Sequence, residues 1–344
     1  MAGDDPDYCE TLRKFYGRKG YYTGLIAPAI LIGGAIIAYF VIMSQVLYPI
    51  MLAIYAWISG SDPNFDINPS FARFSTSYVS LALFVVLVII CNKKDINIFM
   101  RIGSFGIIFV VFLMIFIIAT GVIAFTDTTF SVGSTADSDA TDWGHSDGRI
   151  LVMFNLNFSP LLGILCTGYF LHTCSLPIVR SSKNPDKVGR DMFFGYLFVF
   201  ISYVVVGCMG YIGFMGTNFS SYFVKMEKSD TAGQIDQNCL NMFNYKDVAA
   251  FVLRLAIFLL MLTTYPLLNF FLKDIILKLF FRNIEVSDKT LFIINFGNSF
   301  FSLLFALFFP SVGIILSYAG AISGLVIIYA LPVTTYMKWK RTQI

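Results

Sequence analysis

The sequence predicts an all-α integral membrane protein with eight transmembrane helices. Of its 344 residues, 57% are hydrophobic and only 13% are charged, and Phe alone occurs 37 times. A soluble domain carries about 25% charged residues, so this chain cannot cover a globular surface with polar groups. Its apolar runs show no period-two alternation, which favours helices over the strands of a β-barrel. The net charge of +3 is too small to indicate a nucleic-acid partner, and the expected surroundings are the lipid bilayer.

Eight apolar runs are long enough to cross about 30 Å of hydrocarbon. The first extends from Tyr22 to about Trp57 and contains Pro28 and Pro49. The other seven are expected at 74–91, 102–125, 150–176, 192–215, 248–272, 291–309 and 313–337. The chain therefore divides into a polar N-terminal segment, the eight-helix domain and a basic tail, at residues 1–21, 22–337 and 338–344.

Lys and Arg fall on alternate loops. They precede the first span, follow the second, fourth and sixth spans, and recur in the tail, whereas the loop 126–149 contains five Asp and one Arg. Under the positive-inside rule, this pattern places both termini on the cytoplasm-like side. The first 20 residues are polar and include four acids, which argues against a cleavable signal peptide. The compartment stays open among the mitochondrial inner membrane, the lysosome or vacuole and the plasma membrane.

The sequence shows no signature of an enzyme, a cofactor or a metal site. Its six cysteines are scattered, and no CxxC or HxxxH spacing occurs. The spans contain no paired carboxylates, no HExxH motif and no Cys–His arrangement. We therefore expect a protein that is not an enzyme, with no cofactor and no metal.

The fourth span is the richest in polar and helix-breaking residues. It contains Asn157, Gly168, Tyr169 and His172, together with two prolines. Interrupted helices expose unpaired backbone groups, which transporters use to bind ions and substrates. These four residues are the candidate substrate-binding site. A kinked and well-packed helix explains the pattern equally well, and a lone histidine such as His172 is more often a packing residue than a proton carrier.

The sixth span contains Thr263 and Thr264 just before Pro266. Paired hydroxyls can offer oxygen ligands to a small cation, so the two threonines are the candidate cation site. Such hydroxyls also commonly bond back to their own helix. Arg254, nearer the outer end of this span, is expected to extend toward the interface rather than to form part of a site.

Two further patterns predict contacts between helices. Asn295 and Asn298 lie three residues apart on one face of the seventh span, which is typical of polar residues that join helices in lipid. Gly313, Gly320 and Gly324 in the eighth span predict a face where another helix packs closely.

Four segments of the chain resemble one transporter family. They include GYFLHTCSLPIVRSSKNPDKVGRD at 168–191 and PSVGIILSYAGAISGLVIIYALP at 310–332, together with residues 8–48 and 264–268. These segments resemble the amino acid/auxin permease family, which includes the sodium-coupled neutral amino acid transporters and their lysosomal amino-acid-sensing relative. In chain order they are similar to that family's third, sixth, eighth and tenth helices.

The resemblance implies a five-plus-five inverted-repeat (LeuT-like) fold, in which helices one and six break at the midplane and line the substrate site. Carried over to this chain, Gly168 to His172 would form the broken part of helix six. Thr263 and Thr264 would be the cation ligands.

The resemblance also implies a truncated fold, because the equivalents of helices one, two and eleven are absent from this sequence. Half of the substrate site would then be missing. We therefore expect a transport-incompetent member that serves as a structural or accessory subunit of a larger membrane complex. The alternative is a working Na⁺- or H⁺-coupled neutral amino acid transporter, or an amino-acid sensor, completed by the missing helices and with a small amino acid as its ligand.

Overall fold

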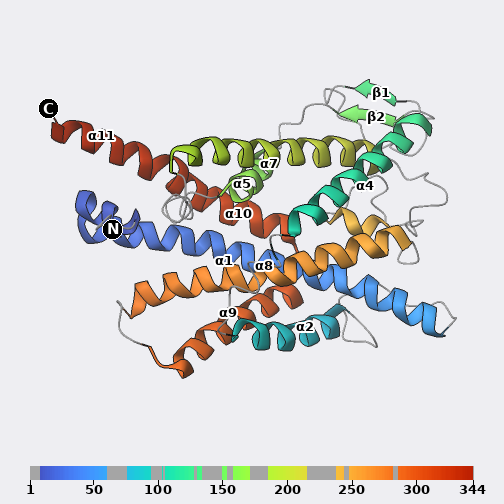
Figure 1. Ribbon diagram of the computed structural model, residues 1–344, viewed down its shortest axis with the longest axis horizontal. Coiled ribbons are helices and arrows are strands. Elements are labelled where there is room, and N and C mark those ends of the chain that lie inside the picture. Colours follow the sequence, from blue (N-terminus) through green and yellow to red (C-terminus); the bar gives the residue numbers. More distant parts are fainter. Residues whose placement is uncertain are drawn as a thin grey trace.

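A computed structural model describes residues 8–59, 76–93, 103, 105–127, 130–133, 149–152, 158–170, 185–214, 238–243, 248–281 and 286–343. Most of these residues are helical, and the longer helices run roughly along one common direction (Figure 1). The helices are α1 (Tyr8–Ser59), α2 (Thr76–Cys91), α4 (Gly106–Asp127), α5 (Ser159–Gly168), α7 (Pro185–Phe214), α8 (Val248–Phe280), α9 (Asp288–Phe308), α10 (Val312–Gly324) and α11 (Leu331–Gln343). A π-helical stretch, Leu325–Ala330, joins α10 to α11, and a short 3₁₀ helix, Cys239–Met242, precedes α8.

Six of the described helical stretches are long and apolar enough to cross a membrane. They are Cys9–Ile58, Gly106–Ile123, Lys187–Gly213, Val248–Phe280, Asp288–Phe308 and Val312–Arg341. Two shorter apolar helices, α2 and α5, occupy the positions of the second and fourth expected spans. The helical membrane class is confirmed, with six span-length helices among the described residues in place of the eight expected.

The start of the fourth span differs from the prediction. Residues Arg149–Val152 form strand β2, which pairs in parallel with β1 (Phe130–Gly133), where we expected a loop and the beginning of a helix. A short apolar run of this kind fits a strand as well as a helix, so its hydrophobicity alone misled the prediction. Helix α5 begins at Ser159, and Pro160 in its first turn has the fixed φ that suits a helix start.

Helix α1 folds back on itself near its N-terminus. Gly17 has a φ of 65° and a ψ of −150°, a left-handed conformation that glycine adopts without steric cost. The turn brings the helical residues before Gly17 against those after it, where Leu12 is buried and the Cys9 thiol lies 3.5 Å from the carbonyl oxygen of Gly24. A Cβ atom at Gly24 would lie 2.7 Å from Cδ1 of Leu12, so glycine allows this close approach.

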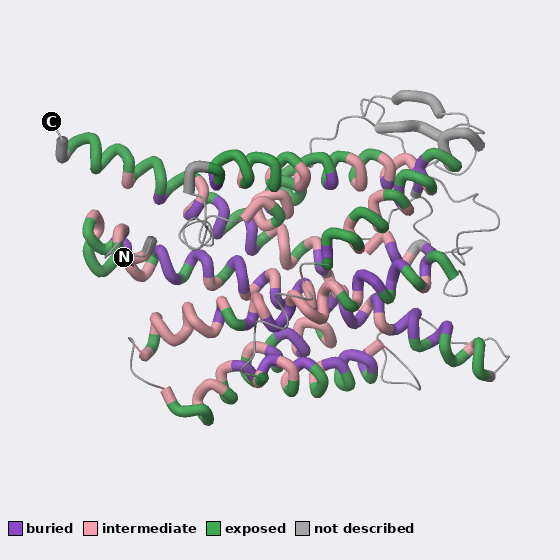
Figure 2. The backbone as a smooth tube through the Cα atoms, viewed as in Figure 1, coloured by how far each residue is buried: buried purple, intermediate pink, exposed green. Residues whose placement is uncertain are grey.

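The rest of α1 is the central helix of the molecule. It packs against α8, α9 and α10, and Figure 2 shows buried residues along most of its length. Phe40 and Met43 are fully buried in a cluster that also contains Leu87 of α2, Tyr265 of α8 and Leu303 of α9. Outer helices such as α7 expose large apolar side chains, as lipid-facing helices do.

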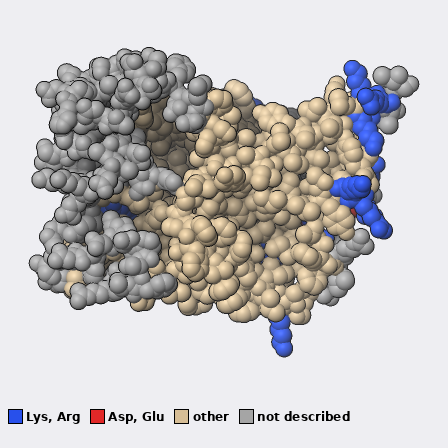
Figure 3. Space-filling view, turned by 180° about the vertical axis from the view of Figure 1, so that it is seen from behind, with Lys and Arg blue, Asp and Glu red and all other residues tan. Residues whose placement is uncertain are grey.

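Positive charge is concentrated at one end of the molecule. Figure 3 shows most of the Lys and Arg side chains of that view at the end where both termini lie in Figure 1. The middle of the surface in the same view is almost free of visible charge. The described cations seen from this side therefore gather at the end that holds both termini.

Candidate functional site

The candidate substrate site lies where α5 ends. Gly168 is the last residue of the helix, and the backbone N–H of Tyr169 donates to the carbonyl of Leu165 at 2.9 Å. The N–H of Phe170 then donates to the carbonyl of Thr167 at 3.2 Å, which tightens the final turn. Asn157 and His172, the other two candidates, lie outside the described residues.

Two tyrosines of α7 lie beside this helix end. The ring of Tyr169 stacks on Tyr196, with 6.4 Å between the centroids, and meets Tyr203 edge to face at 5.3 Å. The Tyr203 hydroxyl donates to the carbonyl oxygen of Gly168 at 3.2 Å. A Cβ atom at Gly168 would lie 2.6 Å from that hydroxyl oxygen, so only glycine accommodates the contact without a shift.

Phe170, two residues after the end of α5, connects this helix end to the core. Phe170 packs against the buried cluster that includes Phe40 of α1 and Tyr265 of α8. Tyr265 directly follows Thr264. The end of α5 and the Thr263–Thr264 pair of α8 therefore adjoin the same core cluster.

The threonine pair is hydrogen-bonded within its own helix. Thr263 and Thr264 both donate their hydroxyl protons to the carbonyl of Leu260, each at 2.8 Å. Helix α8 continues through Pro266, so the pair does not lie at a helix break. This is the back-bonded arrangement that the sequence left open beside cation binding, and each hydroxyl oxygen keeps lone pairs that could still face a cation.

Helix α5 is held by α10 through small residues. A Cβ atom at Gly320 would clash with the backbone carbonyl of Gly163, and one at Gly324 would lie 2.8 Å from Cβ of Cys166. Across the same interface the Thr167 hydroxyl donates to the carbonyl of Leu316 at 3.0 Å. The close-packing face expected at Gly320 and Gly324 is therefore present, and its partner is the helix that carries the candidate substrate site.

A second interface uses amide side chains in place of glycine. Asn295 of α9 donates to Asn92 Oδ1 at 3.0 Å and to the carbonyl of Cys91 at 3.2 Å. It accepts from Asn269 Nδ2 at 3.0 Å, and Asn269 Oδ1 accepts from Asn298 at 3.0 Å. The expectation that Asn295 and Asn298 join helices is confirmed, and their partners lie on α2 and α8.

Asn298 also marks a cavity that the sequence did not reveal. A cavity of about 510 Å³ lies between α1, α9 and α10 and is lined mainly by apolar side chains. Asn298, Ser302 and Tyr318 contribute polar groups to its lining, and Gly33 and Gly34 form part of its wall. Its residues come from α1, α8, α9 and α10, so no local sequence pattern indicates it.

The prediction for Arg254 was wrong. The residue is only 2% exposed, and its Nη2 atom donates to the carbonyls of Leu240 at 2.7 Å and Phe243 at 2.6 Å. The side chain therefore binds the 3₁₀ segment before α8 instead of extending toward the interface. Backbone carbonyls that lack helical partners offer a buried guanidinium the hydrogen bonds that it would otherwise obtain from water.

The described residues contain no group of three or more His, Cys, Asp or Glu side chains that could hold a metal ion. The described groups at the end of α5 are backbone carbonyls, the Tyr203 hydroxyl and tyrosine rings. These are the groups that hold small polar organic molecules within a membrane protein.

Comparison with known proteins identifies the family. A family model described as "Transmembrane amino acid transporter protein" matches residues 4–344. The chain belongs to this family. The resemblance of the four segments noted above is thereby confirmed.

Individual relatives are distant but match almost the whole chain. A "Sodium-coupled neutral amino acid transporter 9 homolog" from Caenorhabditis elegans is 26% identical over 98% of this chain and 58% of its own length. Proteins called "Neutral amino acid transporter 9" from Xenopus tropicalis and Danio rerio are 24% and 23% identical, each over 96% of this chain and 62% of its own length. The chain thus spans about three fifths of the length of the relatives that it matches.

Proposed function

We propose that this chain binds and carries neutral amino acids across a membrane, using the end of α5 as part of its substrate site. The observation that supports this most directly is the termination of α5 at Gly168, beside a tyrosine cluster and against the α1–α8 core. Family membership supports the transport of amino acids, and the names of the relatives support neutral substrates.

The chemistry of the helix end suits the amino group of such a substrate. The C-terminus of a helix carries partial negative charge, and at the end of α5 the Gly168 carbonyl accepts from the Tyr203 hydroxyl. The faces of the tyrosine rings at Tyr169, Tyr196 and Tyr203 can attract an ammonium group as well. A neutral amino acid would therefore place its ammonium group here, and its apolar side chain would face the surrounding core.

Uptake by the purified full-length chain in liposomes tests this proposal. Tyr203→Phe removes only the hydroxyl that binds Gly168, and Tyr169→Leu removes the ring at the helix end. We expect both variants to lower the uptake of radiolabelled neutral amino acids, with the larger loss for Tyr169→Leu. Tyr329→Phe, at an exposed position on the π-helical stretch, is the matched control.

The position of the substrate can be tested in the same assay. Asn298→Leu alters the cavity between α1, α9 and α10 and leaves the tyrosine cluster unchanged. A loss of uptake in Asn298→Leu, with normal uptake in Tyr169→Leu, would move the proposed site to that cavity. Normal uptake in all three site variants would contradict both locations.

An accessory role in a larger membrane complex is the second candidate function. The observation that favours it is the bonding of both Thr263 and Thr264 hydroxyls to the Leu260 carbonyl of their own helix, which is the arrangement of packing residues. Purification from native membranes in mild detergent distinguishes the two candidates. A large particle with stoichiometric partner chains and no uptake activity supports the accessory role, and a lone active chain supports the carrier.

A further inference from the structure

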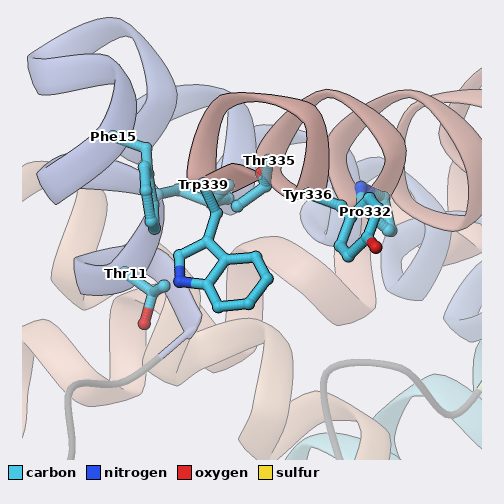
Figure 4. A pocket seen from close by; sticks show the side chains of 7 residues that line it. Thr11, Phe15, Pro332, Thr335, Tyr336 and Trp339 are labelled. Atoms are coloured by element: carbon cyan, nitrogen blue, oxygen red, sulfur yellow. The ribbon is translucent and has the colours of Figure 1, made fainter. Parts of the chain in front are cut away.

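A separate cavity lies at the positively charged end of the molecule, between the first turns of α1 and helix α11. It has a volume of about 300 Å³ and an almost wholly apolar lining (Figure 4). Phe15 and Thr11 line it from α1, and Tyr336, Trp339 and Thr335 line it from α11. The Thr335 hydroxyl is buried and has no hydrogen-bond partner within the described part of the chain.

Two contacts hold the walls of this cavity together. The Lys338 ammonium group donates to the carbonyl oxygen of Phe15 and lies 4.7 Å from the centroid of the Tyr16 ring. The turn at Gly17 then returns the chain into the long part of α1. Residues far apart in the sequence thus form one apolar pocket at the end of the bundle.

The two helices that line the pocket are rich in cations. Residues 8–19 and 331–343 carry seven Lys and Arg side chains but only one acid, Glu10. All seven cations are exposed, and six of them form no ion pair with a described residue: Arg13, Lys14, Arg18, Lys19, Lys340 and Arg341. Asp4, Asp5 and Asp7 precede this segment and lie outside the described residues.

We infer that this pocket binds an anionic phospholipid of the surrounding bilayer. An acyl chain fills the apolar space beside Phe15 and Trp339, and the phosphate and carboxylate groups of the headgroup meet Lys340, Arg341 and the cations of α1. Charge complementarity selects the anionic lipid, because cations near a membrane surface attract anionic headgroups and leave zwitterionic ones unselected. The exposed Tyr336 and Trp339 rings belong at the depth of the interface, where amphipathic aromatic side chains concentrate.

Quenching of Trp339 fluorescence tests the inference on the full chain. Phe is placed at the other two tryptophans, Trp57 and Trp143, so that Trp339 is the reporter. The protein is reconstituted in phosphatidylcholine nanodiscs containing increasing amounts of phosphatidylserine with brominated acyl chains. We expect quenching at a lower mole fraction of brominated phosphatidylserine than of brominated phosphatidylcholine. The full chain includes the charge of the three N-terminal acids, so their neutralising effect is part of the measurement.

Two variants and a matched control locate the site. Lys340→Gln combined with Arg341→Gln should raise the required mole fraction of phosphatidylserine by about 25-fold, because each surface cation contributes on the order of a fivefold preference. Thr335→Phe fills the pocket and should reduce the maximal quenching. Lys187→Gln combined with Lys289→Gln removes two exposed cations from other helices and should change neither value.

Three outcomes would overturn the inference. Equal quenching by the two brominated lipids would show ordinary contact with the bilayer. If Lys187→Gln with Lys289→Gln shifted the required mole fraction of phosphatidylserine as much as Lys340→Gln with Arg341→Gln, the preference would be a general charge effect. A shift in the 340/341 pair without any effect of Thr335→Phe, together with competition by soluble glycerophosphoserine, would show an anion site without a lipid chain. Elution volume and thermal stability of each variant confirm that it is folded.

Discussion

Two interfaces of this bundle hold helices together by different means. Helix α5 meets α10 through glycines, with the backbone of Gly163 against Gly320. Helix α9 meets α2 and α8 through amides, with Asn295 bonded to both neighbours. Apolar surface gains little by leaving lipid for another helix, so membrane helices associate through close backbone packing and hydrogen bonds.

The two interfaces should respond differently to substitution. In the glycine interface, a single added methylene meets backbone atoms that cannot move without shifting a helix. In the amide interface, several weak hydrogen bonds each contribute part of the stability, and one can be lost while the others remain. We therefore expect abrupt failure at the first interface and graded losses at the second. The predictions below test that difference, in order of expected effect.

Gly320→Leu should have the largest effect. Its Cβ would meet the Gly163 carbonyl and the Thr167 hydroxyl, so α5 and α10 must separate. We expect a loss of about 3 kcal/mol of stability or failure to assemble, measured by elution profile and thermal melting in detergent. Gly297→Leu is the matched control, since nothing lies within 4 Å of a Cβ atom at Gly297. Normal assembly of Gly320→Leu would contradict the packing described for this interface.

Arg254→Met should rank second. It removes the donor for the carbonyls of Leu240 and Phe243 and leaves both acceptors buried, at a cost of about 2 kcal/mol. Hydrogen exchange at residues 238–243 should quicken more than exchange in α9, because the 3₁₀ segment loses its anchor. Arg254→Lys keeps the charge and should recover part of the protection. Unchanged exchange in Arg254→Met would show that the segment is held by its apolar contacts alone.

Asn295→Leu should cost less, about 1 kcal/mol, because hydrogen bonds between membrane helices contribute on this scale. A double-mutant cycle with Asn269→Leu should give a coupling energy of about 0.6 kcal/mol for the hydrogen bond between Asn269 Nδ2 and Asn295 Oδ1, which are 3.0 Å apart. Asn298→Leu, which removes a bond to Asn269 but none to α2, serves as the comparison. A loss in Asn295→Leu as large as that in Gly320→Leu would remove the distinction between the two interfaces.

The sequence predicted one side of each interface but not the other. The spacing of Gly320 and Gly324, and of Asn295 and Asn298, places each pair on one helical face, so a contact could be expected without its partner. The partners Gly163, Asn92 and Asn269 lie far away in the chain and depend on the tertiary fold. The helical membrane class was accessible for the same reason, since it depends on composition and local pattern, and the family was accessible from the resemblance of four segments.

The errors arose where short-range patterns compete with distant partners. Arg254 was expected at the interface because nothing in the sequence indicated a buried partner for it. Its hydrogen-bond acceptors are the backbone carbonyls of Leu240 and Phe243, and a backbone acceptor cannot be recognised from residue type. Residues 150–152 were assigned to a helix, although they pair with β1. At the candidate site, α5 ends at Gly168, and the tyrosines of α7 that lie beside this end carry no sequence signal that links them to α5.

Thr264→Val should have the smallest effect and decides whether α8 belongs with the packed interfaces or with a binding site. The hydroxyl bonds only to a carbonyl within its own helix, so its removal should cost no more than about 0.5 kcal/mol. Thermal melting of the wild type, Thr263→Val and Thr264→Val in NaCl and in choline chloride separates the two roles. A cation bound by these oxygens stabilises the wild type in sodium by mass action, and both variants lose that increment. If each of the three proteins melts at the same temperature in NaCl as in choline chloride, Thr263 and Thr264 are packing residues, like the amides of α9.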